Sequence, residues 1–465
     1  MVWLVSLAGL YCSYAAERAR NPFEAREKQK PNIIFILADD LGYGDLGCYG
    51  QTRIKTPNID RLAAEGMRFT QCYAGSTVCA PSRASLMTGL HTGHVRIRGN
   101  AAVPLQPQDV TVAEVLKGAG YTNGIVGKWG LGLANTPGTP NKKGFDEWFG
   151  YLSQTHAHDY YPTQLYRNDF LFTLQANLDG QKGQYSHDLF TTVGLNFVRV
   201  NKHNPFFLYL AYTLPHAQNE LKKQGMPVPS DAPYSKEEWP QMEKNKAAMI
   251  TRLDADVGKL MEELKKMKID DNTLVFFTSD NGPHDEGGVK AAFFDSSGPL
   301  RGIKRDMYEG GIRVPMIAHW PGKIRAGAVS EQVWAFWDFL PTAAEIAGVK
   351  PPAGLDGISM LPTLLGQKQI NQHEFFYWEF HEKGSKQAVR MGDWKAVRLE
   401  PGKPLELYNL KDDLGEKQNV AEKNPEIVAQ IETYLKTART ESPRWPLRSA
   451  QQAKENPEPE EKDKN

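Results

Sequence analysis

Three unbroken apolar runs constrain the fold of this chain more than any other feature of its sequence. They span residues 32–38, 205–212 and 273–278 and contain no charged side chain. A strand is apolar along its whole length when both of its faces are buried, as in a parallel sheet covered by helices. Amphipathic helical patterns lie between the runs, the longest at 244–267. This alternation predicts an α/β fold in which helices flank both faces of a large, mixed but mostly parallel sheet.

Shorter segments complete this expected architecture. Their ends are marked by capping residues, glycines and prolines, which favour the start or the end of a helix or strand. We expect further strands at 67–73 and 121–126, helices at 56–66, 110–119 and 187–200, and loop-rich segments at 133–180 and 218–240.

The pattern changes after residue 350. Short strand-like segments between residues 374 and 410 precede a helical pattern at 425–439. They predict a smaller C-terminal α+β subdomain with an antiparallel sheet. We therefore divide the chain into a main domain, 30–350, a C-terminal subdomain, 351–440, and a tail, 441–465. The tail is polar and highly charged, so its composition predicts disorder.

The N-terminal segment has several features of an export signal. Residues 2–16 form an apolar run that is too short to span a bilayer, and Ser13 and Ala15 supply small residues for cleavage. No basic residue precedes the run, so we interpret residues 1–16 as an atypical signal peptide of a secreted or periplasmic protein. Cys12 follows Leu and Tyr, a poor match to a lipoprotein signal. No later run reaches transmembrane length.

Overall charge assigns the chain to no particular class of partner. Lys and Arg together number 55, as do Asp and Glu, so the formal net charge is zero. A nucleic-acid-binding surface is therefore not expected, and recognition of any anion must be local. Beyond Cys12 and Cys79, the remaining cysteines, Cys48 and Cys72, form either one bridge or two free thiols, which is no disulfide framework.

Polar residues follow the ends of several expected strands. In a parallel sheet these ends meet at one edge, where ligands of such folds bind. We therefore expect one shared site there. Its members are Asp39, Asp40, Lys128, His216, Asp280 and Asn281.

The acidic members of this group suit a hard metal ion. Asp39, Asp40, Asp280 and Asn281 offer only oxygen atoms, which favour Ca²⁺ or Mg²⁺ over Zn²⁺. The alternative is structural, because Asp and Asn side chains also cap loops.

The stretch from Val78 to Gly89 places a cysteine at the start of a helix. Pro81 suits a first helical turn and Gly89 can end the helix. Cys79 then lies just ahead of the helix N-terminus, where negative charge is favoured, and Arg83 offers donors to a tetrahedral anion. The residues thus suggest a nucleophile beside an anion site, with a thiol pKa that could be lowered. The alternative is a buried structural cysteine.

The same stretch resembles the signature of the type I, formylglycine-dependent sulfatases of the alkaline phosphatase superfamily, C-x-P-x-R followed by x-x-x-[LM]-T-G. The resemblance implies that a formylglycine-generating enzyme oxidises Cys79 to Cα-formylglycine and that Arg83 holds the modified side chain. It also implies that the hydrated aldehyde attacks sulfur. The family metal is one Ca²⁺, bound by the residues equivalent to Asp39, Asp40, Asp280 and Asn281 with the modified Cys79.

Two further motifs extend the resemblance over roughly residues 30–440. Gly127-Lys128-Trp129 is similar to the second sulfatase signature, which makes Lys128 a sulfate ligand, but Gly130 stands where that signature usually has His. His156 and His158 are candidates for the missing role. His216 is implied to bind sulfate or protonate the leaving oxygen. Lys304, which precedes a family-specific Tyr-Glu-Gly-Gly-Ile-Arg-Val-Pro run, is implied to bind sulfate.

The resulting interpretation is a sulfuric ester hydrolase with residues 30–350 as its catalytic domain. Its substrate is expected to be a sulfated small molecule or, more specifically, a sulfated glycan. Three alternatives stay open at this point: a phosphate or phosphonate monoester hydrolase on the same scaffold, an inactive protein that binds sulfated glycans, and a hydrolase that uses the unmodified Cys79 thiol.

Overall fold

The computed structural model describes residues 30–455, and strand β1 (Asn32–Ala38) lies at the centre of its larger sheet. On either side β1 pairs in parallel with β7 (Phe206–Ala211) and β8 (Thr273–Ser279). The strand order is β10-β2-β9-β8-β1-β7-β3-β4-β5-β6, with β11 paired to β2. The other strands of this sheet are β2 (Met67–Tyr73), β3 (Thr122–Lys128), β4 (Glu147–Tyr151), β5 (Gln164–Arg167), β6 (Phe170–Thr173), β9 (Arg313–His319), β10 (Ala328–Ser330) and β11 (Trp334–Ala335).

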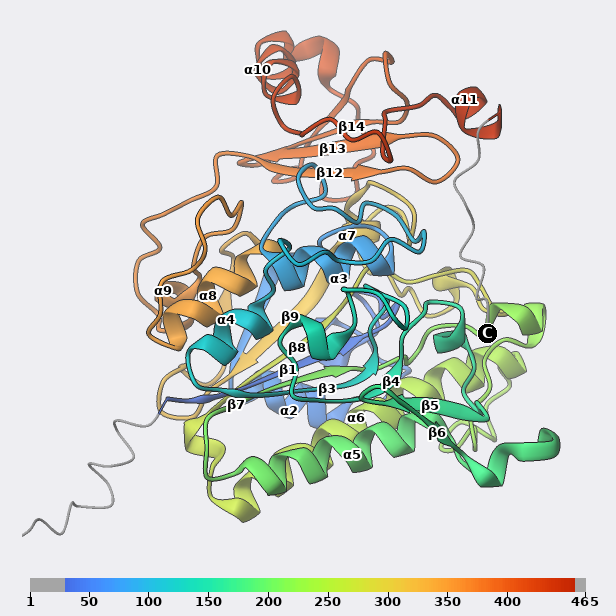
Figure 1. The fold of residues 1–465 in the computed structure, drawn as a ribbon. Helices are drawn as coiled ribbons and strands as arrows, with labels where there is room; N and C mark the ends of the chain where they lie inside the picture. The colour runs from blue at the N-terminus through green and yellow to red at the C-terminus, as the bar shows by residue number, and fades with distance from the viewer. Residues whose placement is uncertain (1–29, 456–465) are drawn as a thin grey trace, which may run out of the picture. The chain divides into compact units, whose positions relative to one another are not determined.

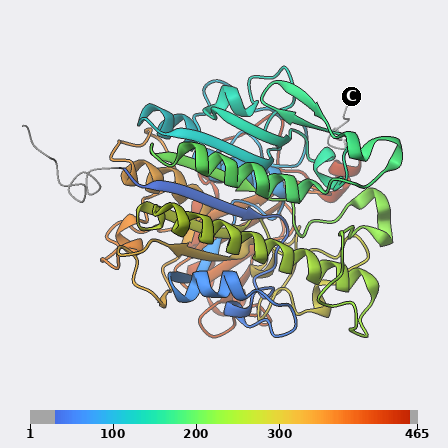
Figure 2. The same cartoon turned by 90° about the horizontal axis from the view of Figure 1, so that it is seen from below.

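Helices cover both faces of this sheet, as the unbroken apolar runs predict (Figures 1 and 2). Alternate side chains of β1 enter different cores: Phe35 packs in the cluster of the upper helices of Figure 1, and Ile34 and Ile36 in that of the lower ones. The upper helices are α3 (Cys79–Thr88), α4 (Val112–Gly118), α8 (Phe339–Ile346) and the short α9 (Leu361–Leu364); the lower ones are α2 (Pro57–Ala64), α5 (Ser186–Asn201) and α6 (Gln241–Met267).

The prediction of a mostly parallel, mixed α/β sheet is confirmed, with one difference in its extent. The sheet is mixed because strand β9 runs antiparallel to both β2 and β8. Residues 133–180, which we expected to be mainly loop, contain β4, β5 and β6, which extend the sheet beyond β3. These strands are four or five residues long, too short to show a clear alternation in the sequence.

A second, four-stranded antiparallel sheet follows, as predicted. It is joined to the first sheet by direct contacts: Trp378 Nε1, from its first strand, donates to the carbonyl of Ala74 (2.9 Å). Because both sheets belong to one compact unit that begins at Pro31, the domain boundary near residue 350 stays a prediction. The elements of this part are β12 (Phe376–Phe380), β13 (Lys386–Met391), β14 (Trp394–Arg398), β15 (Glu406–Asn409) and α10 (Pro425–Leu435); α7 (Glu309–Ile312) precedes β9.

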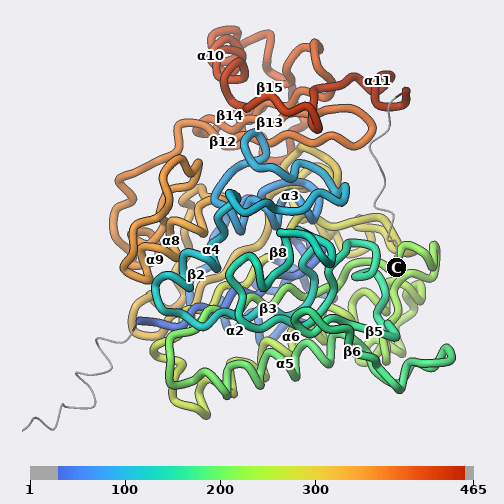
Figure 3. The backbone as a smooth tube through the Cα atoms, viewed as in Figure 1, coloured from blue at the N-terminus to red at the C-terminus, as the bar shows by residue number. Residues whose placement is uncertain are grey.

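Residues 441–455 correct the expectation of a disordered tail. Trp445 is 2% exposed and its Nε1 donates to the carbonyl of Arg96 (2.9 Å). The chain then runs back across the second sheet to α11 (Ala450–Glu455), as Figure 3 traces in red. The average composition of the tail wrongly predicted disorder for these residues, because one large apolar side chain anchors an otherwise polar segment. The rest of the predicted tail, 456–465, lies outside the described residues.

Three further sequence predictions concern the signal peptide, membrane spans and a disulfide bridge. The expected signal peptide, residues 1–16, also lies outside the described residues. Within 30–455, no helix has both the length and the apolar character needed to cross a membrane. Cys48, Cys72 and Cys79 are free thiols, so the possible bridge between Cys48 and Cys72 is not formed.

Candidate active site

The carboxyl ends of β1 and β8 bring four oxygen-bearing side chains together. Asp39 and Asp40 follow β1, and Asp280 and Asn281 follow β8. The Asp40 backbone N–H donates to Asp280 Oδ1 (3.1 Å), and Asn281 Nδ2 donates to Asp40 Oδ1 (2.7 Å). All four residues are fully buried. The acid cluster predicted from strand ends is therefore one connected group.

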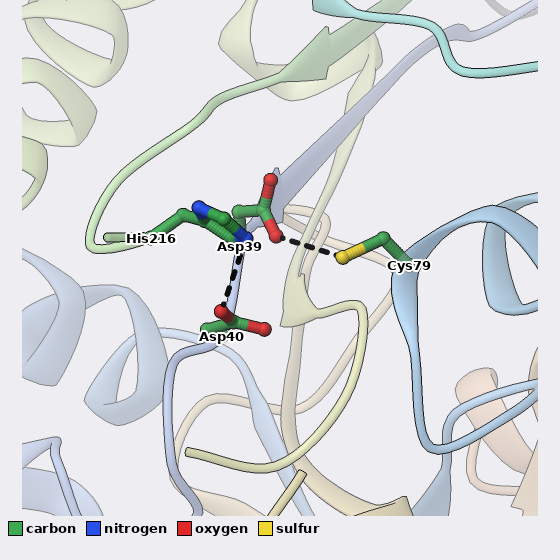
Figure 4. A group of neighbouring side chains, drawn as sticks. All are labelled: Asp39, Asp40, Cys79 and His216. Atoms are coloured by element: carbon green, nitrogen blue, oxygen red, sulfur yellow. Dashed lines mark hydrogen bonds and ion pairs between the residues drawn. The ribbon is translucent and has the colours of Figure 1, made fainter. Parts of the chain in front are cut away.

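Cys79 reaches this cluster from α3 (Figure 4). It is the first residue of the helix, after Val78 in extended conformation, and its Sγ lies 3.3 Å from Asp39 Oδ1. Arg83, one turn further on, donates through Nε and Nη2 to Asp280 Oδ2 (3.0 and 2.8 Å) and through Nη1 to the carbonyl of Lys128 (2.9 Å). Arg83 thus ties the cysteine helix to the ends of β8 and β3.

Two buried lysines complete the charge balance. Lys128 Nζ lies 2.8 Å from Asp39 Oδ2, and Lys304 Nζ lies 2.8 Å from Asp40 Oδ2. Burial by itself would raise the pKa of Asp39, but Lys128 and the other nearby cations hold it well below its usual value. The site thus keeps charged groups of both signs together in a dry environment, where electrostatic interactions are strong.

His216 is held in a defined tautomer. Its Nδ1 lies 2.7 Å from the carbonyl of Ala217, which can only accept, so Nδ1 carries the proton. Its Nε2 therefore presents a lone pair, 3.2 Å from Lys304 Nζ and 3.5 Å from Asp40 Oδ2. Burial and then the charge of Lys304 lower the pKa of His216, in agreement with a neutral ring.

The space beside Gly130 is filled by a residue that the sequence did not reveal. Gly130 adopts a φ of +76°, and a Cβ there would lie 2.0 Å from Nε2 of Gln154. Gln154 is 7% exposed and lines the same cavity as Cys79. Its loop comes close to Gly130 only because β4 pairs with β3, and no local signal in the sequence marks it.

The two candidate histidines have different positions. The ring of His158 stacks on that of His216, with centroids 4.8 Å apart, and lines the cavity. Its Nδ1 lies 2.9 Å from Glu220 Oε1, a partner that sequence analysis missed. The ring of His156 instead packs edge-on against Tyr151, outside that cavity lining. The structure therefore brings His158, but not His156, to the site.

The acid cluster fits a divalent cation with oxygen ligands. Within residues 30–455, Asn281 Oδ1 is buried and receives no hydrogen bond, which is costly for an amide oxygen unless another positive group meets it. Burial and then the charge of Asp39 raise the pKa of Asp280 to about 7. Although the formal charges of the cluster balance, both features indicate room for a further cation at Asp280 and Asn281. The donor set of the cluster is the one that Ca²⁺ prefers.

The Cys79 thiol does not have the lowered pKa that a helix N-terminus suggests. Burial, and then the carboxylates of Asp280 and Asp39, raise its pKa well above the usual value. The Sγ–H can donate to Asp39 Oδ1, which keeps the proton on sulfur. The suggestion of a lowered thiol pKa is therefore not supported, because burial and the neighbouring carboxylates raise it instead.

A cavity of about 830 Å³ opens from Cys79 toward the second sheet. On its inner side it is lined by Cys79, His216 and Lys304, together with Gln154 and His158. Its volume lies in the range of small-molecule sites in proteins. The cavity therefore has room for much more than one tetrahedral anion.

Two family models match the chain. The model Sulfatase matches residues 31–349, and the model N-sulphoglucosamine sulphohydrolase, C-terminal, matches residues 302–441. The chain belongs to the sulfatase family. The N-acetylgalactosamine-6-sulfatase of Rattus norvegicus is 36% identical over 405 residues, which cover 79% of this chain and 71% of that protein. Together these matches make this chain a sulfuric ester hydrolase.

Two solved structures are similar to this chain over most of its length. Ps i-CgsB in complex with k-i-k-neocarrahexaose is 33% identical, with a TM-score of 0.79, and the match covers 91% of this sulfatase and 96% of that chain. The phosphonate monoester hydrolase of Agrobacterium radiobacter is 21% identical, with a TM-score of 0.64 and coverage of 88% and 95%. The second likeness concerns the fold alone, and it agrees with the layered α/β architecture described above.

Proposed function

We propose that this sulfatase hydrolyses sulfate esters of a glycan, with a formylglycine made from Cys79 as nucleophile and one Ca²⁺ at the acid cluster. One observation supports this proposal above all others. Cys79, three buried carboxylates and three buried cations lie together at the ends of β1, β3 and β8. The relative named N-acetylgalactosamine-6-sulfatase and the neocarrahexaose complex both concern sulfated sugars, which supports a glycan as substrate.

The residues of the site define where Ca²⁺ and the formylglycine would lie. Ca²⁺ would be held by Asp39, Asp40, Asp280 and Asn281 and would supply positive charge that polarises a sulfate oxygen and the nucleophile. Oxidation of Cys79 would supply an aldehyde whose hydrate replaces a thiol that the surrounding carboxylates keep protonated. This conversion makes a formylglycine-generating enzyme a partner during maturation, and we propose export of the chain from the cytoplasm.

The chain's own cations would hold the sulfate. Lys128 and Lys304 both point their ammonium groups into the acid cluster, next to Cys79. As charge shifts to the ester oxygen, Lys304 is placed to donate a proton toward it, directly or through Nε2 of His216 at 3.2 Å. Arg83 keeps the Cys79 helix in register with Asp280. Preorganised charge of this kind is the main source of such catalysis.

We assign the base role to His158. Its Nδ1 contacts Glu220 Oε1, so the carboxylate orients the ring and leaves the lone pair on Nε2, and the residue lines the cavity. Burial lowers the pKa of His158, which keeps the ring neutral. Gln154, beside Gly130, can hold a hydroxyl group but cannot take its proton, because the side-chain amide is not basic near neutral pH.

The substitution His158→Ala should lower kcat by about 10²- to 10⁴-fold, the usual contribution of a general base. The matched variant His156→Ala removes a ring of the same loop that packs on Tyr151, and its kcat should stay within about twofold of wild type. Both are measured as steady-state hydrolysis of 4-nitrophenyl sulfate. Equal losses in the two variants would remove His158 from the mechanism.

A comparison of sulfate and phosphate esters tests the proposed function. Purified protein, produced together with a formylglycine-generating enzyme, should hydrolyse 4-nitrophenyl sulfate with a kcat/KM at least about 100-fold above that for 4-nitrophenyl phosphate, a difference of about 3 kcal/mol in transition-state binding. A preference for phosphate would favour the monoester phosphohydrolase alternative. Binding of sulfated glycans without turnover would favour an inactive binding protein.

Metal removal provides the control for that experiment. Dialysis against a chelator should abolish turnover, and Ca²⁺ should restore it more completely than Zn²⁺, because the four ligands offer only oxygen. The chelated protein should also melt at a lower temperature, since Asp39, Asp40 and Asp280 then repel one another in a buried site. Full activity after exhaustive chelation would contradict the calcium assignment.

A further inference from the structure

The cavity that begins at Cys79 continues outward, beyond the groups that would hold one sulfate. Its outer wall is formed by residues 381–385, which connect β12 to β13, and by residues of the segment 444–454. A ligand that places a sulfate ester at Cys79 and is longer than one sugar can therefore extend along the cavity against these two segments. Neither segment takes part in the chemistry proposed above.

Hydrogen bonds hold this outer wall in place. The backbone N–H of Ser385 donates to the carbonyl of Arg448 (2.8 Å), and the N–H of Arg448 donates to Ser385 Oγ (2.9 Å). The buried Trp445 packs against the ring of His381, with centroids 5.5 Å apart. The backbone that carries the outer side chains is thus fixed before any ligand arrives, which lowers the cost of binding.

The cavity lining is strongly basic although the chain as a whole is neutral. Arg305 is neutralised by Glu286 and Glu382, and Lys304 by Asp40. None of the ion pairs within residues 30–455 involves the outer cations Lys383, Arg444 or Lys454. The lining contains six cations, Lys304, Arg305, Lys383, Arg444, Arg448 and Lys454, and one acid, Glu382.

We propose that this outer pocket, lined by Lys383, Arg444, Arg448 and Lys454, binds a second anionic group, a sulfate or a carboxylate, on a sugar next to the one whose ester is cleaved. The inference rests on the proposed function, because the inner end of the cavity must hold the first sulfate. It defines the substrate as a glycan with at least two anionic groups. The rigid wall and the cations that it carries give the pocket both charge and shape to recognise such a group.

The test compares three hexasaccharides of equal length: k-i-k-neocarrahexaose, which is sulfated, hexagalacturonic acid, which is carboxylated, and neutral maltohexaose. The inhibition constant of each against 4-nitrophenyl sulfate turnover, and its Kd by calorimetry, are measured with the full-length holoenzyme. The test variant is Lys383→Ala/Arg444→Ala. The control, Arg325→Ala/Lys350→Ala, removes the same number of exposed cations outside this cavity.

At least one anionic hexasaccharide should bind about tenfold or more tightly than maltohexaose, the effect of roughly one charged hydrogen bond. The test variant should bind that anionic hexasaccharide at least about tenfold more weakly than the wild type does. Its kcat/KM for 4-nitrophenyl sulfate should fall by a smaller factor. The control variant should change by less than about twofold in both measurements. Tighter binding of the sulfated or of the carboxylated sugar identifies the second group. Equal binding of all three sugars, or equal losses in both variants, would overturn the inference; failure to hydrolyse the aryl sulfate would overturn the proposed function instead.

Discussion

The variant Cys79→Ala is expected to lose sulfate ester hydrolysis by at least about 10⁴-fold in kcat. Removal of the nucleophile from an enzyme with a covalent mechanism commonly costs this much or more. Here Cys79 is the first residue of α3, and its Sγ contacts Asp39 Oδ1 in the acid cluster. The measurement is steady-state turnover of 4-nitrophenyl sulfate, with peptide mass on the wild-type protein. The wild-type peptide that contains Cys79 should be about 18 Da lighter than the mass calculated for the unmodified cysteine peptide, which is the change from thiol to aldehyde.

The control for this experiment is Cys48→Ala. Cys48 is also a free thiol, but it lies in a short helical turn away from the cavity, so its removal should leave kcat within about twofold of wild type. A wild-type peptide of unmodified mass in fully active protein would refute the formylglycine mechanism. Activity in the Cys79→Ala variant would refute any nucleophilic role for this residue.

The variant Glu309→Ala is expected to lower the free energy of unfolding by about 3–5 kcal/mol, because it removes the nearer carboxylate partner of the buried Lys395 and leaves only Glu416 at 3.6 Å. Glu309 Oε1 accepts from Lys395 Nζ (2.9 Å), and Oε2 accepts from Tyr73 OH (2.5 Å) and Arg313 Nη1 (3.2 Å). Lys395 and Glu309 are both fully buried. These contacts join the second sheet to β2 and β9, so their loss should also loosen the cavity wall.

Urea unfolding followed by fluorescence measures this effect, with Lys290→Ala as the surface control. The side chains of Lys290 and Asp285 are 69% and 39% exposed, and such a pair contributes less than about 1 kcal/mol. The milder variant Glu309→Gln keeps the shape of the side chain but removes its charge. If charge is the cause, its free energy of unfolding should lie between those of Glu309→Ala and Lys290→Ala. Equal stability of Glu309→Ala and wild type would show that the network does not stabilise the fold.

The strand ends show what local sequence could predict. A parallel sheet brings the residues after its strands to one edge whatever the loops do, so Asp39, Asp280 and Lys128 could be placed together from the apolar runs before them. The helix at Cys79 followed in the same way from Pro81 and Gly89. Their roles and the formylglycine came from a resemblance of motifs, because spacing alone indicates only proximity.

Other parts of the site depend on pairing between segments far apart in the chain. Gln154 fills the space beside Gly130 because β4 pairs with β3. The pKa of Cys79 is raised because packing buries the thiol and because Asp280 and Asp39 arrive from other strands. Such long-range contacts leave no periodic signal in the sequence.

The sequence by itself determined the layered α/β architecture, the edge of the sheet at which the site forms and the family to which its motifs belong. Burial of continuous apolar runs and the direction of parallel strands are sufficient for that result. Only the tertiary structure decided between His156 and His158, the protonation of the Cys79 thiol and the outer wall built from residues 444–454. Each of these depends on which charges and rings meet in a buried space, and that is set by packing between distant segments.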